Sequence, residues 1–143
     1  MIPRLVEIKL LHPRAKLPTK AHASDAGWDI YSIGSYDIAP GTTVNVETGI
    51  AAAAPEGFYF TIDGRSGLSR KGIFPFRGIL DAGYQGPICA ALTNVSSEPY
   101  RVNDGDRVAQ LILHRCEALA FNVVQDFRAP SARGTKGFGS SGR

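Results

Sequence analysis

Cysteine and histidine are scarce in this chain of 143 residues, which has two cysteines and three histidines. Cys89 and Cys116 lie far apart, each in an apolar stretch, and no Cys-x-x-Cys pair occurs. The histidines, His12, His22 and His114, show no metal-ligand spacing. The sequence therefore predicts two free thiols in a reducing compartment rather than a disulfide framework or a zinc site. A chain of this length buries roughly 68–70% of its unfolded surface and needs no covalent support for its core.

Long apolar runs are also absent. Arg4, Glu7 and Lys9 interrupt every apolar run near the first residue, so no signal peptide is predicted. The longest apolar stretches fall well short of the ~18 residues that a membrane-spanning helix needs. The sequence thus predicts a soluble, intracellular protein of the cytoplasm with no membrane partner, and it leaves a nuclear location or a viral origin open.

Few segments show the 3.6-residue spacing of apolar residues that is typical of a helix. Apolar and polar residues instead mix at strand spacing, and turn residues such as Pro-Gly and Asn-Asp-Gly separate the runs. Strands are predicted over residues 5–10, 44–47, 58–63, 88–92, 108–113 and 121–124. One short helix is predicted to begin near Ser66 and to end before Gly72. The pattern predicts an all-β fold, a sandwich or a jelly roll.

The net positive charge of the chain is confined to its C-terminus. Arg133, Lys136 and Arg143 equal the whole formal excess of +3, and removing them from the 16 basic side chains leaves 13, matching the 13 acidic ones. A nucleic-acid-binding domain more often spreads its charge over a face, so no nucleic-acid partner is predicted. Residues 133–143 combine glycines, hydroxyls, cations and one aromatic ring. We expect a β domain over residues 1–130 and a flexible arm over 131–143 that closes over a phosphorylated ligand, with a plain disordered terminus as the alternative.

Two glycine-containing motifs carry groups that a phosphorylated ligand needs. The first, residues 64–72, places Arg65 and a serine at the predicted helix start, where amides and a guanidinium favour phosphate. The second, residues 78–86, places Asp81 before a glycine turn, with Tyr84 three residues on. The residues alone leave open a capped turn with a solvated basic face and a turn-forming aspartate.

Two further motifs surround glycines with polar residues. Residues 23–30 hold two aspartates that can orient a metal's water shell or cap a turn. Residues 105–111 lead from a turn into a strand that carries Gln110. Each motif is weak evidence by itself, and their order along the chain is the stronger signal.

The five ordered motifs resemble those of trimeric dUTP diphosphatases (dUTPases). They read Ser-Asp-Ala-Gly-Trp-Asp, Gly-Arg-Ser-Gly-Leu, Gly-Ile-Leu-Asp-Ala-Gly-Tyr-Gln-Gly, Gly-Asp-Arg-Val-Ala-Gln-Leu and Arg-Gly-Thr-Lys-Gly-Phe-Gly-Ser-Ser-Gly, and the likeness spans about residues 4 to 142. The resemblance implies a jelly-roll-like (β-clip type) barrel with a glycine-rich arm, assembled as a homotrimer with active sites at subunit interfaces. It implies hydrolysis of dUTP to dUMP and pyrophosphate with Mg²⁺ on the triphosphate, which limits uracil incorporation into DNA and supplies dUMP for dTMP synthesis.

The resemblance also assigns roles around the base. Asp81 would be the general base that orients the attacking water. Tyr84 would pack under the deoxyribose and leave no room for a 2′-hydroxyl. Backbone groups of the hairpin around Ile79, Leu80 and Cys89 would read the uracil edge.

The remaining roles concern the phosphates and the metal. In the body, the residues implied to hold phosphates are Arg65, Ser66, Gly67 and Gln110. In the arm, Phe138 would stack on the base, and the γ end would be gripped by Arg133, Gly139 and Ser140. Asp29 would serve either the metal's hydration shell or the fold of its own motif.

Three positions depart from the family pattern. Pro75 stands six residues before Asp81, where many relatives carry an asparagine that helps to hold the base hairpin or its ligand. Pro87 replaces a common polar residue and removes one backbone donor from the hairpin. Lys136 replaces a frequent glycine and adds a cation to the arm.

Three alternatives remain. A dCTP deaminase shares the implied fold, but Ala91 stands where its proton-transferring glutamate would be, and an alanine cannot move a proton. A non-catalytic nucleotide-binding module of the same superfamily would not need Asp81 and a complete arm. A single-stranded nucleic-acid binder would need a basic face that residues 1–132 lack.

Overall fold

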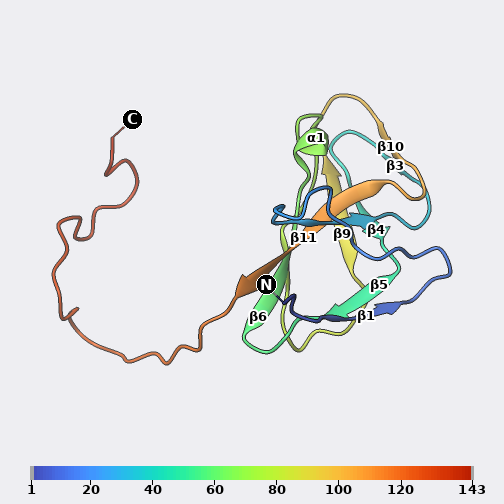
Figure 1. Cartoon of the computed structure of the whole chain (residues 1–143). Helices are drawn as coiled ribbons and strands as arrows, with labels where there is room; N and C mark the ends of the chain where they lie inside the picture. The colour runs from blue at the N-terminus through green and yellow to red at the C-terminus, as the bar shows by residue number, and fades with distance from the viewer. Residues whose placement is uncertain (1, 143) are drawn as a thin grey trace.

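The computed structural model describes residues 2–142, and within them the chain is nearly all β (Figure 1). Its strands are β1 (Glu7–Leu10), β2 (Trp28–Tyr31), β3 (Tyr36–Ile38), β4 (Thr43–Glu47), β5 (Ile50–Ala53), β6 (Phe58–Asp63), β7 (Ile73–Pro75), β8 (Gly78–Leu80), β9 (Cys89–Asn94), β10 (Tyr100–Val102) and β11 (Arg107–Arg115). Five of the six predicted strands are found at or near their predicted positions, and β6 has the predicted bounds. The all-β prediction is confirmed.

Two antiparallel sheets form the body of the molecule. One has the strand order β2-β11-β6-β8 and the other the order β4-β9-β7, while β1–β5 and β10–β3 form two-stranded ribbons. Alternate residues of both sheets share one buried cluster, so the sheets face each other as in a jelly roll. The large buried side chains of that cluster are Ile30, Ile38, Val46, Ile50, Phe60, Ile62, Leu68, Ile73, Leu80, Ile88, Leu92, Val102, Val108 and Leu111.

This alternation decides where functional side chains lie. On β11, Ala109 and Leu111 are buried in the core, so Gln110 between them faces away from it. Asp29 pairs with Gln110 across β2 and β11, and Asp63 pairs with Gln110 across β6 and β11. The outer face of the sheet therefore gathers polar groups from three strands.

The helix α1 (Ser66–Ser69) lies directly after β6 and is only one turn long. Its buried Leu68 anchors it to the core, and Gly72 follows it with a φ of +82°, a left-handed conformation that favours glycine. The predicted short helix is confirmed. Within residues 2–142, no helix is long and apolar enough to cross a membrane.

The C-terminal segment, residues 116–142, runs away from the body and every residue of it is exposed (Figure 1). The strand predicted over residues 121–124 is wrong, because no strand of the described chain pairs with this segment. Phe121 and Val123 are 93% and 96% exposed. Their alternation has the period of a strand, but a strand also needs a hydrogen-bonding neighbour.

Candidate active site

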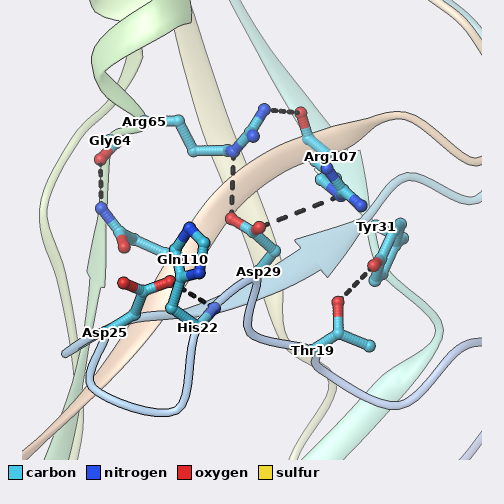
Figure 2. A network of polar contacts seen from close by, with 9 residues as sticks. All are labelled: Thr19, His22, Asp25, Asp29, Tyr31, Gly64, Arg65, Arg107 and Gln110. Atoms are coloured by element: carbon cyan, nitrogen blue, oxygen red, sulfur yellow. Dashed lines mark hydrogen bonds and ion pairs between the residues drawn. The ribbon is translucent and has the colours of Figure 1, made fainter.

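A cluster of charged side chains joins three of the motifs at the outer face of the first sheet (Figure 2). Arg65 Nε donates a hydrogen bond to Asp29 Oδ1 at 3.0 Å, and Arg65 Nη1 donates to the Arg107 carbonyl at 3.4 Å. Arg107 Nε lies 3.9 Å from Asp29 Oδ2. We call Asp29, Arg65, Arg107 and Gln110 the arginine cluster. Asp29 thus contacts two guanidinium groups and is itself half-buried.

Gln110 closes the other side of the arginine cluster. Its Nε2 donates to the Gly64 carbonyl at 2.8 Å, which fixes the chain just before Arg65. Gly27 makes this possible, because a Cβ there would lie 1.8 Å from Gln110 Oε1. The glycine of the first motif is therefore required by the packing of the glutamine of the fourth.

Tyr31 borders the arginine cluster on the Arg107 side. Its hydroxyl hydrogen-bonds Thr19, and this bond, with a second one to Arg107, holds the pKa of Tyr31 below its usual range. The same contact with Tyr31, reinforced by Asp29, raises the pKa of Arg107. Arg107 is thus fixed as a cation beside Arg65.

Residues 78–89 form the second group of predicted side chains. β8 pairs with β6 only, within the described chain, so its other edge presents unpaired backbone groups. Ile79 is 64% exposed on this strand, whereas Leu80 is buried in the core. Asp81 follows directly, and its carboxylate forms no hydrogen bond or ion pair within residues 2–142.

Tyr84 is held in one orientation within this hairpin. Its hydroxyl donates to the Pro87 carbonyl at 2.7 Å. A Cβ at Gly86 would lie 2.7 Å from the same hydroxyl, so glycine is required there. Pro87 lacks an N–H, as the sequence predicts, but its carbonyl supplies the acceptor that fixes the tyrosine. Cys89 begins β9, half-buried and paired with Glu47.

Two separate cavities receive these groups. One, of about 560 Å³, is lined by Arg65 and Gly67, among others. The other, of about 530 Å³, is lined by Ile79 and Asp81, with Glu56 and Cys116. The two linings share no residue, so a single chain keeps Arg65 and Arg107 in one cavity and the catalytic candidate Asp81 in another. Ser66 is exposed at the start of α1.

The predicted residues of the arm join neither cavity. Arg133 donates from Nε to the Lys136 carbonyl at 2.8 Å, and Phe138 is fully exposed. Gly139 has a φ of +77°, and Ser140 donates its amide to Gly137. Within residues 2–142, the hydrogen bonds of these side chains stay inside the segment itself.

No group of three or more His, Cys, Asp or Glu side chains in the described chain could hold a metal ion. Asp29 is occupied by two guanidinium groups, which favours its structural role over a direct metal contact. Sequence reasoning missed Arg107 and Gly27 as parts of the site. Both lie inside quoted motifs, but only their packing against Asp29 and Gln110 reveals what they do.

Comparison with known proteins gives a consistent result. A sequence model of the dUTPase family matches residues 13–142. The deoxyuridine 5′-triphosphate nucleotidohydrolase of Thermobifida fusca is 43% identical over 141 residues, which cover 96% of this chain and 78% of that protein. The enzyme of the same name from Solibacter usitatus is 39% identical over 149 residues, covering both chains completely.

Solved structures agree with the sequence relatives. The dUTPase of Staphylococcus bacteriophage 80alpha bound to dUPNHPP superposes with a TM-score of 0.92 at 30% identity, covering 99% of this chain and 100% of that chain. A mutant dUTPase of phage phi11 of S. aureus, described with a structural Mg(II) ion, has a TM-score of 0.82 at 25% identity, covering 88% and 100%.

Proposed function

This chain belongs to the dUTPase family and hydrolyses dUTP, and we propose that it does so with Asp81 as the general base. The observation that carries the proposal is the Asp81 carboxylate, which lies in a cavity beside the open edge of β8 and is committed to no other side chain of the described residues. An unpaired carboxylate accepts a proton from water without first breaking an ion pair.

The reaction needs few groups. Asp81 takes a proton from the water that attacks phosphorus, the bond between the α- and β-phosphoryl groups breaks, and pyrophosphate leaves. Phosphoryl transfer of this kind depends on positioning and charge neutralisation. The groups we propose for the phosphates are the Arg65 guanidinium, the Ser66 hydroxyl, the Gly67 amide and the Gln110 amide. Arg65 and Gln110 are already fixed by Asp29 and Gly64.

Recognition of the nucleoside is assigned to the hairpin. The unpaired edge of β8 at Ile79 and Leu80, with the backbone at Cys89, offers donors and acceptors for the uracil edge. Tyr84 packs under the deoxyribose. The hydrogen bond to Pro87 and the close approach of Gly86 hold its ring, and a fixed ring can exclude a 2′-hydroxyl by contact.

Mg²⁺ is proposed as the ion that accompanies the triphosphate. The described residues offer no carboxylate cage, which fits an ion that keeps its waters and binds mainly through substrate phosphates. The ion would neutralise phosphate charge. Asp29 would contribute through its hold on Arg65, and any contact with the ion would pass through water.

A homotrimer is proposed as the active form. Arg65 and Asp81 line different cavities of one chain, so a second copy is needed if each site combines them across an interface. The C-terminal segment leaves Leu119, Phe121, Val123 and Phe127 exposed, and apolar side chains gathered in this way mark a contact surface. We propose that residues 1–130 form the body and that the arm from 131 closes over a neighbouring site, where Arg133, Phe138, Gly139 and Ser140 meet the nucleotide.

We expect this activity to limit uracil in DNA and to supply dUMP, and its cytoplasmic location stays a prediction. The decisive test is hydrolysis of dUTP, dCTP, dTTP and UTP by the purified protein, with nucleotide and pyrophosphate products measured. A dCTP deaminase would release ammonia from dCTP, and Ala91 on β9 offers no proton for that reaction.

The role of Asp81 is tested by Asp81→Asn. We expect kcat for dUTP to fall by on the order of 10²–10⁴, the range of a lost general base, with little change in affinity for a non-hydrolysable analogue. Glu56→Gln is the matched control, because it removes another carboxylate from the same cavity. Near-parental turnover of Asp81→Asn would overturn the assignment.

A further inference from the structure

The C-terminal segment contains a small closed loop that carries two cations. Arg133 Nε donates to the Lys136 carbonyl at 2.8 Å, and Arg133 Nη2 donates to the Gly137 carbonyl at 3.4 Å. The Lys136 amide in turn donates to the Arg133 carbonyl at 3.3 Å. We call residues 133–137 the cationic loop. These bonds tie the backbone at Lys136 to the Arg133 guanidinium without the help of a ligand.

The cationic loop begins at a turn that is itself hydrogen-bonded. The Gly134 amide donates to Ser131 Oγ at 3.0 Å. Gly134 has a φ of +58°, in the left-handed region that favours glycine. The cationic loop therefore has a local structure of its own within a segment that is exposed throughout.

The charge in and around the cationic loop is of one sign. Residues 127–142 contain three basic side chains, Arg128, Arg133 and Lys136, and no acidic one. None of the three forms an ion pair within the described chain. Two exposed cations held in one loop without an acidic partner favour an anionic ligand.

Both cations keep donors that the cationic loop does not use. A guanidinium has several N–H groups, and Arg133 uses only Nε and Nη2 here, so Nη1 has no partner among residues 2–142. Lys136 enters the loop through its backbone alone, and its ammonium group forms no hydrogen bond in the part of the chain that the structure describes. The loop can therefore stay closed while both side chains bind the same anion.

We propose that Lys136 is a further binding residue for the terminal phosphoryl group of dUTP and that it increases the preference of the protein for dUTP over dUDP. The inference rests on the proposed function, in which Arg133 contacts that end of the triphosphate. A terminal phosphoryl group carries about two negative charges near neutral pH, more than one cation neutralises. Because dUDP lacks the third phosphoryl group, it loses the contact with Lys136 and keeps the contacts made by the hairpin.

The experiment is calorimetric titration of the full-length protein with a non-hydrolysable dUTP analogue and, separately, with dUDP, both in the presence of Mg²⁺. Lys136→Gln removes the charge and keeps a side chain of similar length. It is expected to weaken binding of the analogue roughly 3- to 10-fold, the effect of one charge-assisted contact reduced by solvent screening. Affinity for dUDP should stay within about a factor of two, because the contact requires the third phosphoryl group. Lys136→Arg retains the charge and should bind the analogue within about a factor of two of the parent.

Arg128→Gln is the matched control, because it removes one exposed cation from the same segment but lies outside the cationic loop. Equal losses in Lys136→Gln and Arg128→Gln, unchanged affinity for the analogue in Lys136→Gln, or an equal loss of affinity for dUDP would each overturn the proposal. Turnover of dUTP by the parent is measured on the same sample. A parent that hydrolyses dUTP but shows one of those three results refutes the role of Lys136 alone, whereas a parent that does not hydrolyse dUTP refutes the proposed function.

Discussion

The arginine cluster and the C-terminal segment carry similar chemical groups in opposite physical states. In the cluster, Arg65 is held by Asp29 and by a backbone carbonyl, and Gln110 is held by Gly64. In the segment, Arg133 bonds only neighbouring carbonyls among the described residues, and Phe138 is fully exposed. The first region is organised without a ligand, and we expect the second to become ordered when the ligand binds. The cluster loses its conformational entropy when the chain folds, whereas the segment loses it when the ligand binds.

Between these two regions, the largest expected effect comes from removing the arm. Deletion of residues 132–143 should lower kcat/KM for dUTP by roughly 10²–10³, the combined value of one stacking contact and the charge-assisted bonds of Arg133. The melting temperature should stay within about 3 °C, because every described residue removed is exposed. Turnover and thermal unfolding are measured on the same sample. Parental turnover by the shortened chain would show that the arm is only a disordered end.

A smaller effect is expected from a single ring. Phe138→Ala should weaken binding of a dUTP analogue roughly 5- to 150-fold, since a base stacked on an aromatic ring contributes about 1–3 kcal/mol. Stability should not change, because the ring contacts nothing in the free chain. Phe138→Trp is the control that keeps a stacking surface and should bind nearly as well as the parent. If alanine and tryptophan behave alike, the ring does not stack on the base.

The arginine cluster should respond in the opposite way to mutation. Asp29→Asn leaves Arg65 without its carboxylate partner, and we expect kcat/KM to fall roughly 10- to 50-fold as the guanidinium loses its orientation. Asp37→Asn is the control, because it breaks another Asp–Arg pair, 2.8 Å from Arg101, at an exposed site. Asp29→Asn should differ from Phe138→Ala in the protein without a bound nucleotide analogue. Hydrogen exchange at Ser69, whose amide donates to the Arg65 carbonyl at 2.9 Å, should increase in Asp29→Asn and stay unchanged in the ring variant, and the comparison fails if both behave alike.

Sequence patterns predicted the fold class and the longer strands, and the reasons are physical. β6 alternates apolar and more polar residues over its six positions, and β11 contains an apolar run of strand length, so both are visible in the sequence before any partner is known. β3, β8 and β10 have three residues each, too few to show a period, and their pairing with distant strands defines them. Residues 121–124 show the reverse case. They have the two-residue alternation of a β-strand, but no strand of the described chain pairs with them.

The site divides in the same manner. The order of the motifs identified Asp29, Arg65 and Gln110 as candidate site residues, because residue types and their order can be read from the sequence alone. Their mutual contacts join residues 36 positions apart or more, such as Arg65 with Asp29, and follow only from strand pairing. Arg107 was missed for that reason, since its importance lies in its distance to Asp29 and Tyr31. The proposed contacts of the arm stay predictions.

The smallest expected effect concerns pH and belongs to the body. Asp104 Oδ1 accepts the Gly34 amide at 2.6 Å, and Oδ2 lies 3.2 Å from Arg14 Nε. The amide contact first, and the arginine second, hold the pKa of Asp104 below its usual value. A carboxyl whose pKa is lower in the folded state than in the unfolded state stabilises the fold above its unfolded pKa of about 3.9. That contribution is lost as the pH falls through the lowered pKa of the folded state.

Asp104→Asn keeps an acceptor for the Gly34 amide but carries no charge. It therefore removes only the stabilisation that the charge of Asp104 contributes. The melting temperature of the variant should lie slightly below that of the parent at pH 7, and the difference should shrink as the pH falls below about 3.9 toward the lowered pKa of Asp104. Thermal unfolding at pH 7, 5, 4 and 3 measures the difference directly. The arm-deleted protein should show the same pH dependence as the parent, since the contacts of Asp104 with Gly34 and Arg14 join loops of the body alone. A difference that persists at the lowest pH would mean that amide geometry, not charge, makes Asp104 stabilising, and a pH dependence altered by the deletion would mean that the arm contacts the body before any ligand binds.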